Sequence, residues 1–279
     1  MHTPAYHTQL IIAASERLGR YLQALPRDAW DHLSACQGWT VRDVVGHLVW
    51  GAELYATTVT RGLHGASDPF DGLPPAGSVT GDSAAPLFDQ LSLARGASLG
   101  EQLLPTFLSS SAHLSAVFAG VGPQGWNAVC YHPGGLAPAW AFVDFRLTEL
   151  VMHGWDIRSR FEPTMSLPPE SVPVFLSVLA AGIGWIFRPG PPPSAPVRYR
   201  FAMTDPVPSS LDIVVSGTQA QVEHDSMAQA DVTLQCSAET WVFLMYGRLR
   251  LQEALAQGRI TADGPTDLVT AFAQWFRGV

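Results

Sequence analysis

Residues 140–160 read WAFVDFRLTELVMHGWDIRSR, and this stretch decides most of the fold assignment. Its apolar residues are distributed almost all round a helix, which is typical of a helix that is buried on most of its surface. Against that background Arg146, Glu149, His153 and Asp156 form one polar stripe, with spacings of three, four and three residues. Burying a carboxylate or an imidazole inside a bundle costs several kcal/mol of stability unless the group is paired or binds a metal. The stripe therefore either faces solvent or belongs to a buried polar site.

A second histidine can complete such a site. His47 lies in the segment GWTVRDVVGHL (38–48), on the apolar side of the helix expected there. Glu149 and His153 are one turn apart, and with a histidine from a facing helix they form a three-ligand set that leaves one metal position open. Spacing alone is weak evidence, because ExxxH is a frequent pattern and a buried histidine is more commonly a satisfied core residue.

Four helices are expected in the first half of the chain. A capping-box-like start at 40–43 and a first-turn proline at Pro138 mark two of the beginnings. Apolar periodicity predicts helices over residues 11–25, 40–62, 84–119 (broken near Gly96–Gly100 or at Pro105) and 138–161. Four helices joined by loops are the pattern of a four-helix bundle.

The periodicity changes in the second half. A further helix is expected over 171–187, and the proline-rich run RPGPPPSAP (188–196) resembles a linker. Strands are predicted near 197–201, 211–215, 219–223 and 231–236, and helices near 238–246 and 266–276. The fold class is therefore α+β with two domains: an N-terminal four-helix bundle (1–165) and a small C-terminal α+β domain (166–279).

Composition excludes several classes of protein. The formal net charge is -8 and the pI is about 5.5, which argues against a nucleic-acid-binding face. No apolar stretch approaches the ~20 residues that span a bilayer, and the N-terminus lacks a signal-like apolar region. We expect a cytoplasmic protein whose partners are neither nucleic acid nor membrane, with its oligomeric state left open.

The three cysteines, Cys36, Cys130 and Cys236, are far apart in the sequence and form no CxxC pair. Neither a disulfide framework nor a cysteine zinc knuckle is therefore supported. Cys36 and Cys130 could lie near the site, but the expected bundle already supplies three ligands. Six other histidines have no partner at ligand spacing and are expected on the surface or in loops: His2, His7, His32, His64, His132 and His224.

Two segments carry a resemblance. GWTVRDVVGHL (38–48) and RLTELVMHGWDI (146–157) resemble the signature segments of the mycothiol-dependent maleylpyruvate isomerase family, within the DinB-like metal-binding bundles. The resemblance covers roughly residues 5–165. It implies that His47, Glu149 and His153 bind a divalent metal, usually zinc. Residues 231–276 more loosely resemble the sterol-carrier-protein-like domain that such proteins often carry.

The same resemblance implies an enzyme that uses mycothiol, a low-molecular-weight thiol, as co-substrate. Asp156 could orient His153 or pair with an arginine at the helix end. Arg146 could pair with Glu149 or Asp156, or hold an anionic substrate. Arg248, in the second domain, is a candidate for contacting the substrate or the thiol. We include Arg146, Asp156 and Arg248 as expected catalytic or cofactor-contacting residues.

Three functions are compatible with these features. The first is transfer of the thiol sulfur to a small-molecule electrophile, in detoxification or natural-product biosynthesis. The second is cis–trans isomerisation of the maleylpyruvate type, and the third is non-catalytic binding of a small molecule around a structural metal. No arginine occurs between Arg61 and Arg95, where a clamp for a dianionic substrate is expected. This favours the transferase.

Overall fold

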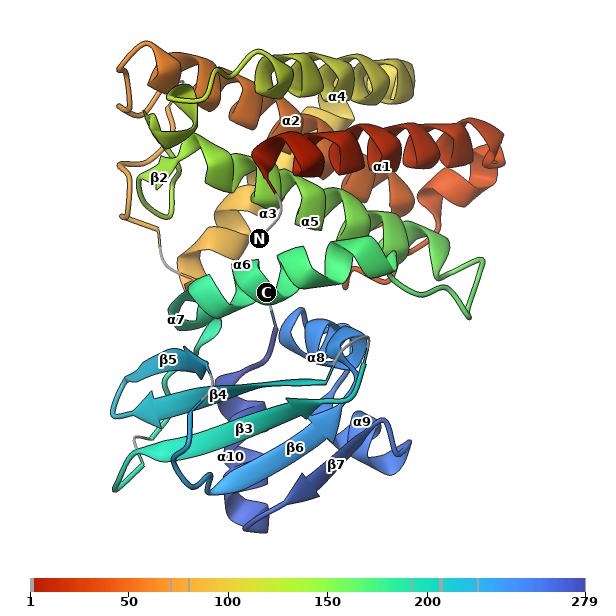
Figure 1. Ribbon diagram of the computed structural model, residues 1–279. Coiled ribbons are helices and arrows are strands. Elements are labelled where there is room, and N and C mark those ends of the chain that lie inside the picture. The colour runs from red at the N-terminus through yellow and green to blue at the C-terminus, as the bar shows by residue number, and fades with distance from the viewer. Residues whose placement is uncertain are drawn as a thin grey trace. The chain divides into compact units, whose positions relative to one another are not determined.

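A computed structural model describes residues 3–70, 72–79, 81–191, 193–205, 208–224 and 226–278. The chain divides into two compact units, Met1–Ser171 and Val172–Val279 (Figure 1). The sequence placed the division after residue 165, six residues earlier. None of the described helices is long and apolar enough to cross a membrane.

The first unit is helical, as expected. Its helices are α1 (Pro4–Ala24), α2 (Val41–Leu63), α3 (Gly81–Leu99), α4 (Leu103–Ala119) and α5 (Ala139–Arg158). Helix α2 packs against α3, α4 and α5, and α1 packs against α4 and α5. Short 3-10 segments lie at Arg27–Asp31, Gly100–Gln102, Gly125–Asn127 and Pro169–Ser171, and the two-residue strands β1 (Val129–Cys130) and β2 (Ala137–Pro138) form a small ladder. The core therefore lies between α1, α2, α4 and α5.

Local sequence explains where these helices begin and end. Thr40 and Asp43 form the expected capping box at the start of α2, each side chain bonding the other's backbone N–H. The third predicted helix is two helices, because Gly100 adopts a φ of +51° and ends α3. Of the two break points that the sequence suggested, the glycine segment is the one used.

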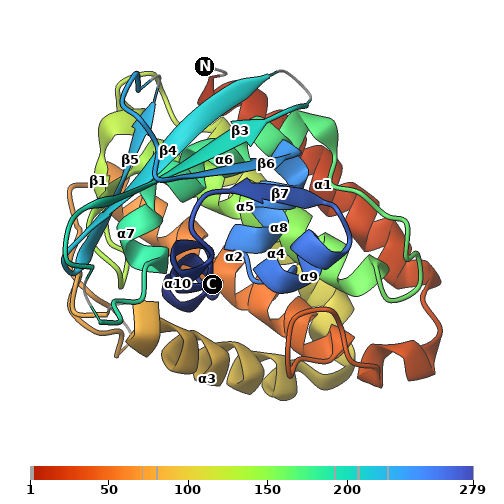
Figure 2. The ribbon, with the colours of Figure 1, turned by 90° about the horizontal axis from the view of Figure 1, so that it is seen from below.

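Two glycines let α2 and α3 approach closely. A Cβ on Gly46 would lie 2.9 Å from the Cα of Gly96, closer than real Cβ contacts come. Figure 2 shows α3 along one side of this unit. The contact fixes the register of α3 against the part of α2 that carries His47.

The second unit is a five-stranded mixed sheet with helices, as the α+β prediction required. Its order is β5-β4-β3-β6-β7; β3 and β6 are parallel, and the other neighbours are antiparallel. The strands are β3 (Val197–Met203), β4 (Ser209–Ser216), β5 (Gln219–His224), β6 (Val232–Cys236) and β7 (Ile260–Asp263). The helices are α6 (Val172–Ala181), α7 (Ile183–Ile186), α8 (Ala238–Met245), α9 (Leu251–Ala256) and α10 (Thr266–Trp275).

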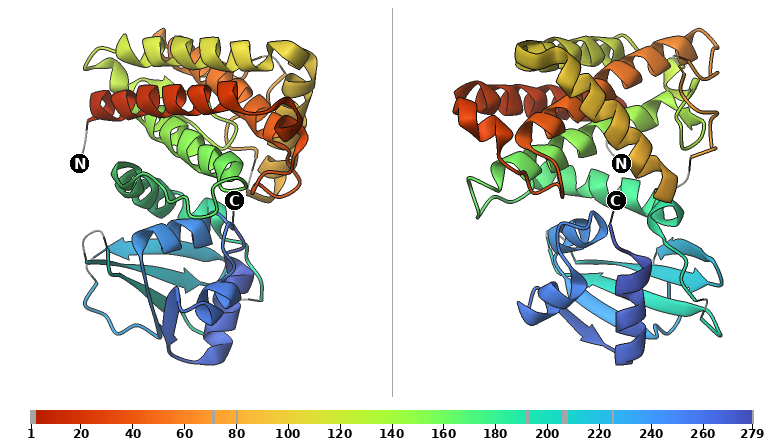
Figure 3. Two further views of the ribbon diagram at one scale, coloured as in Figure 1. Left: turned by 90° about the vertical axis from the view of Figure 1, so that its right-hand side faces the viewer. Right: turned by 180° about the vertical axis from the view of Figure 1, so that it is seen from behind.

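The two faces of β3 differ. Tyr199 and Phe201 are fully buried and contact Trp241 of α8 and Phe272 of α10, so α8 and α10 cover that face (Figure 3). On the other face, Arg200 binds Asp212 of β4. This alternation is what a strand that is buried on one side requires.

Several details of the second unit correct the sequence-based expectations. Strand β7 and helix α9 were not predicted, and the helix expected over 171–187 is divided into α6 and α7. The proline run 188–196 lies within the second unit, where the N–H of Arg188 donates to the carbonyl of Trp275 at 2.8 Å. The run is therefore not the boundary between the units.

Candidate metal centre

The three predicted ligands lie together in the first unit. His47 projects from α2, and Glu149 and His153 project from α5. The Nε2 of His47 is 4.0 Å from the Oε1 of Glu149, and the ring centroids of His47 and His153 are 4.8 Å apart. The fold thus brings together residues about 100 positions apart in the sequence, and their binding of a metal stays a prediction.

Each histidine is oriented through the same ring atom. The Nδ1 of His47 is 3.0 Å from the hydroxyl of Ser92, and the Nδ1 of His153 is 2.9 Å from Oδ2 of Asp156. Such partners fix the tautomer and the ring orientation of metal-binding histidines. Both rings would therefore present Nε2 to a metal.

The carboxylate of Glu149 supports the same interpretation. Its Oε1 accepts a hydrogen bond from the hydroxyl of Tyr55 at 2.8 Å. Its Oε2 is buried and accepts no hydrogen bond from any described residue, although Nη1 of Arg146 lies 3.8 Å away. A buried carboxylate oxygen without a hydrogen bond is unfavourable, and a divalent cation would compensate it. The donor set of two imidazoles and one carboxylate fits zinc.

Opposing effects act on the ionisation of Glu149. Burial raises the pKa of its carboxyl group, whereas Arg146, the Tyr55 hydrogen bond and His153 lower it. The net direction is upward. A bound cation would favour the charged form of the carboxylate.

Asp156 is fully buried and bonds His153, whereas the nearby Arg158 pairs with Glu162 at 2.8 Å. Of the two contacts expected for Asp156, the geometry therefore contains the one with histidine. Its expected catalytic contribution stays a prediction.

Arg146 is fully buried too. Its Nη1 donates to the Leu48 carbonyl at 2.9 Å and its Nη2 donates to the Ser111 hydroxyl at 3.2 Å. The expected approach to Glu149 is present at 3.8 Å. These contacts join α5 to α2 and α4 and favour the structural alternative over substrate binding, which stays a prediction.

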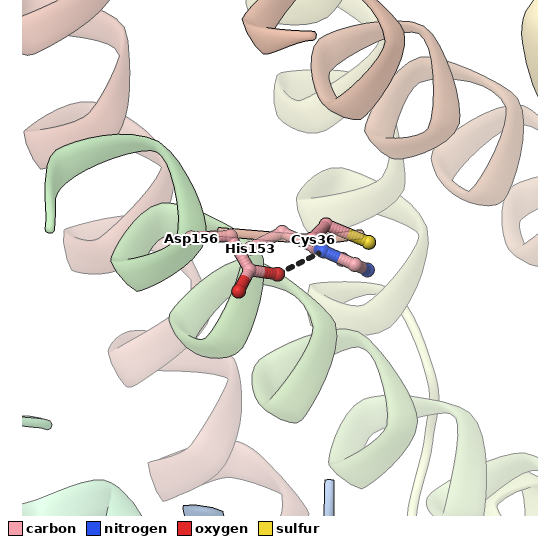
Figure 4. A group of neighbouring side chains, drawn as sticks. All are labelled: Cys36, His153 and Asp156. Atoms are coloured by element: carbon pink, nitrogen blue, oxygen red, sulfur yellow. Dashed lines mark hydrogen bonds and ion pairs between the residues drawn. The ribbon is translucent and has the colours of Figure 1, made fainter. Parts of the chain in front are cut away.

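Cys36 also lies at this site. A ligand atom from each of Cys36, His153 and Asp156 can be chosen so that all three lie within 4.8 Å of one another. Figure 4 shows the Cys36 sulfur away from the Asp156 carboxylate, toward the opposite end of the His153 ring. Cys36 was expected near the site but not as a ligand, because the bundle already supplies three ligands.

The sequence matches known families over both units. The model of the mycothiol maleylpyruvate isomerase N-terminal domain matches residues 12–158, more than half of the chain. The chain belongs to the mycothiol maleylpyruvate isomerase family. The model of the SCP-2 sterol transfer family matches residues 197–277. No curated protein is significantly similar in sequence.

Solved structures share the fold of this mycothiol maleylpyruvate isomerase family member. The crystal structure of a mycothiol-dependent maleylpyruvate isomerase aligns with a TM-score of 0.63 and 16% identity, covering 94% of this chain and 93% of that chain. The structure of a mutant of such an isomerase aligns with a TM-score of 0.62 and 15% identity, with the same coverage. At these identities the likeness shows a common fold.

The match to the mycothiol maleylpyruvate isomerase family includes His47, Glu149 and His153, but Arg248 lies in the SCP-2 match. Arg248 follows α8, and its Nη1 donates to the Tyr246 carbonyl at 2.8 Å. Its contact with a substrate or with the thiol stays a prediction.

Two histidines expected on the surface or in loops are not exposed, and His2 lies outside the described residues. His7 is buried in α1, with its Nδ1 2.6 Å from Oδ1 of Asp144. His132 lies among the rings of Tyr55, Phe88, Phe142 and Phe145, and burial lowers its pKa to about 4. At neutral pH His132 is therefore an uncharged member of an aromatic cluster.

Proposed function

We propose that the chain is a metal-dependent enzyme that uses mycothiol to attack an electrophilic carbon. The observation that carries the proposal is the Glu149 carboxylate next to two histidines that are both held through Nδ1: its Oε1 lies 4.0 Å from Nε2 of His47, and its Oε2 is buried without a hydrogen bond from a described residue. Membership of the mycothiol maleylpyruvate isomerase family supports mycothiol as the thiol.

The residues of the site have distinct tasks in this proposal. His47, Glu149 and His153 would hold a divalent cation, with zinc the best match to the donor set. A thiol has a free pKa of about 8.5, and the bound cation would favour its thiolate form. Glu149 is poorly suited as a general base, since its lone pairs would serve as ligands. Ser92, Asp156 and Tyr55 position the three ligands through the hydrogen bonds described above.

Isomerisation is the reaction that family membership supports. In it the thiolate adds to one carbon of a cis double bond, the resulting single bond rotates, and elimination returns the thiolate and the trans product. No atom is gained or lost overall. The thiol is therefore required but is not consumed.

Transfer of the thiol to an electrophile is a second candidate, which the side chains near the ligands support. The ring centroids of Trp39 and Trp50 lie 5.2 and 6.2 Å from the ring centroid of His47. Arg146 is engaged by backbone and hydroxyl oxygens, and Arg95 forms a two-bond ion pair with Glu53. These surroundings suit an uncharged or aromatic electrophile better than a dianion.

Product analysis tests both candidates. The metal-loaded protein is incubated with mycothiol and either maleylpyruvate or a panel of uncharged electrophiles, and the products are identified by mass spectrometry. Formation of the trans isomer with the thiol unchanged supports isomerisation, and a thioether adduct supports transfer. Hydrolysis without any thiol contradicts the proposal and indicates a water nucleophile. The absence of any thiol-dependent turnover favours the non-catalytic alternative.

A further inference from the structure

The loop that precedes α2 is held in one conformation by its own hydrogen bonds. The hydroxyl of Ser34 donates to the Trp39 carbonyl at 2.9 Å and accepts from the N–H of Cys36 at 3.1 Å. The N–H of Trp39 donates to the Cys36 carbonyl at 3.1 Å, and Gly38 supplies the positive φ that the turn needs. Cys36 is thus positioned by a closed network and not by a loose surface loop.

The same loop is fastened to the helix that carries two of the expected ligands. The N–H of Ala35 donates to the backbone carbonyl of Asp156 in α5 at 2.8 Å. The Trp39 ring stacks on the His153 ring with an interplanar angle of 18° and a centroid distance of 6.2 Å. These contacts keep Cys36 next to His153.

Cys36, His153 and Asp156 could hold a metal in more than one way. Asp156 is already the hydrogen-bond partner of the Nδ1 of His153 and is fully buried, so its role is to orient that ring. The Cys36 sulfur lies toward the other end of the ring, where Nε2 would face the metal (Figure 4). One ring nitrogen of His153 lies within 4.8 Å of the Cys36 sulfur, and two ligands of a tetrahedral zinc ion are roughly 3.5 Å apart, so the Cys36 side chain would move toward the ring to share an ion with it.

We propose that Cys36 is a fourth protein ligand of the metal that His47, Glu149 and His153 bind. This inference rests on the metal site of the proposed function. A thiolate added to two imidazoles and one carboxylate shifts the site toward zinc and cobalt and away from magnesium and manganese. Zinc in catalytic sites accepts a fifth ligand, so Cys36 coordination is compatible with an incoming thiol.

Cobalt spectroscopy tests the proposal on the full chain. Apo protein is titrated with Co²⁺ in a buffer free of added thiol, and the near-ultraviolet thiolate-to-cobalt charge-transfer band is recorded beside the bound metal content. The expected result is a band that saturates at one equivalent in the wild type. Cys36→Ala should lose that band and keep the bound cobalt, with weakened affinity. Cys130→Ala is the matched control, since Cys130 lies in the same unit, and should keep the band.

The outcomes separate the two proposals. If the wild type binds no cobalt, or if His47→Ala and Glu149→Ala keep full metal content, the metal site itself is wrong. If cobalt binds and is lost in those variants, yet the charge-transfer band is absent or survives Cys36→Ala, then Cys36 is not a ligand. Circular dichroism of each variant confirms that the helices are intact.

Alkylation gives a readout that needs no variant. Cleavage after arginine places the three cysteines in separate peptides, 28–42, 96–146 and 201–248. Cys36 is partly exposed, whereas Cys130 and Cys236 are buried. Adding zinc to the apo protein should slow iodoacetamide labelling of peptide 28–42 at least tenfold and leave the other two unchanged. Equal labelling rates of peptide 28–42 with and without zinc would overturn the proposal.

Discussion

Replacing Asp156 by asparagine should weaken metal binding without unfolding the bundle. The change keeps the shape of a fully buried side chain but removes the charge that bonds the Nδ1 of His153 at 2.9 Å. An amide can turn its NH₂ group toward Nδ1 and so favour the tautomer whose proton occupies Nε2, the atom needed for the metal. Loss of such an indirect partner lowers metal affinity by about 10–100-fold, or about 1.4–2.7 kcal/mol.

Competition with a zinc-binding chromophoric chelator measures this affinity. The matched control is Asp144→Asn, because Asp144 also lies on α5 and also bonds a buried histidine, His7, at 2.6 Å. The control should bind zinc within about twofold of the wild type. The reasoning fails if Asp156→Asn binds zinc as tightly as the wild type, or if both variants lose affinity equally.

Three further predictions concern stability. Gly46→Ala should lower the free energy of unfolding by about 1–3 kcal/mol in urea, because its Cβ would lie 2.9 Å from the Cα of Gly96; an unchanged midpoint would contradict this. Arg146→Ala removes one member of a buried ion pair and should lower the free energy of unfolding in urea by about 3–5 kcal/mol. If Arg146 only bound substrate, the variant would keep its stability and show a changed KM. Burial acts to raise the pKa of Asp212, but the hydrogen bonds from the arginines of β3 outweigh it and lower the pKa. This stabilisation is present above the unfolded pKa of about 4 and is lost as pH falls through the folded value. At pH 7 the amides of β4 should therefore be less protected from hydrogen exchange in Asp212→Asn than in the wild type. In acid the protection of these amides should become equal in the two proteins.

Local patterns in the sequence were sufficient to predict the helices and strands that apolar periodicity or capping residues define. The apolar distribution in residues 140–160 and the Thr40–Asp43 capping box depend on neighbours within four positions, and both occur in the structure. Strand β7 was missed because it has four residues, of which Ile260 alone is buried. Such a short edge strand shows no alternation from which it could be recognised.

Contacts over long sequence separations account for the rest. The approach of Cys36 to His153 depends on a backbone hydrogen bond between Ala35 and Asp156, which no spacing rule encodes. The pair of His7 with Asp144 spans 137 positions. Each of these residues looks ordinary within its own segment, and only the packing of α1 and of the loop before α2 on α5 gives them a partner.

The close approach of α2 and α3 has a consequence for how sequence variation in this protein should be interpreted. Gly46 precedes His47, and Ser92 lies one turn before Gly96, so a single backbone contact sets the distance between the Ser92 hydroxyl and the imidazole. A helix that donates no ligand thereby helps to decide which nitrogen of His47 carries the proton. Larger residues at position 92 or 96 of α3 would displace the Ser92 hydroxyl from His47 and so impair metal coordination. A mutational scan would score both positions as loss-of-function positions, although neither side chain would touch the metal or the substrate.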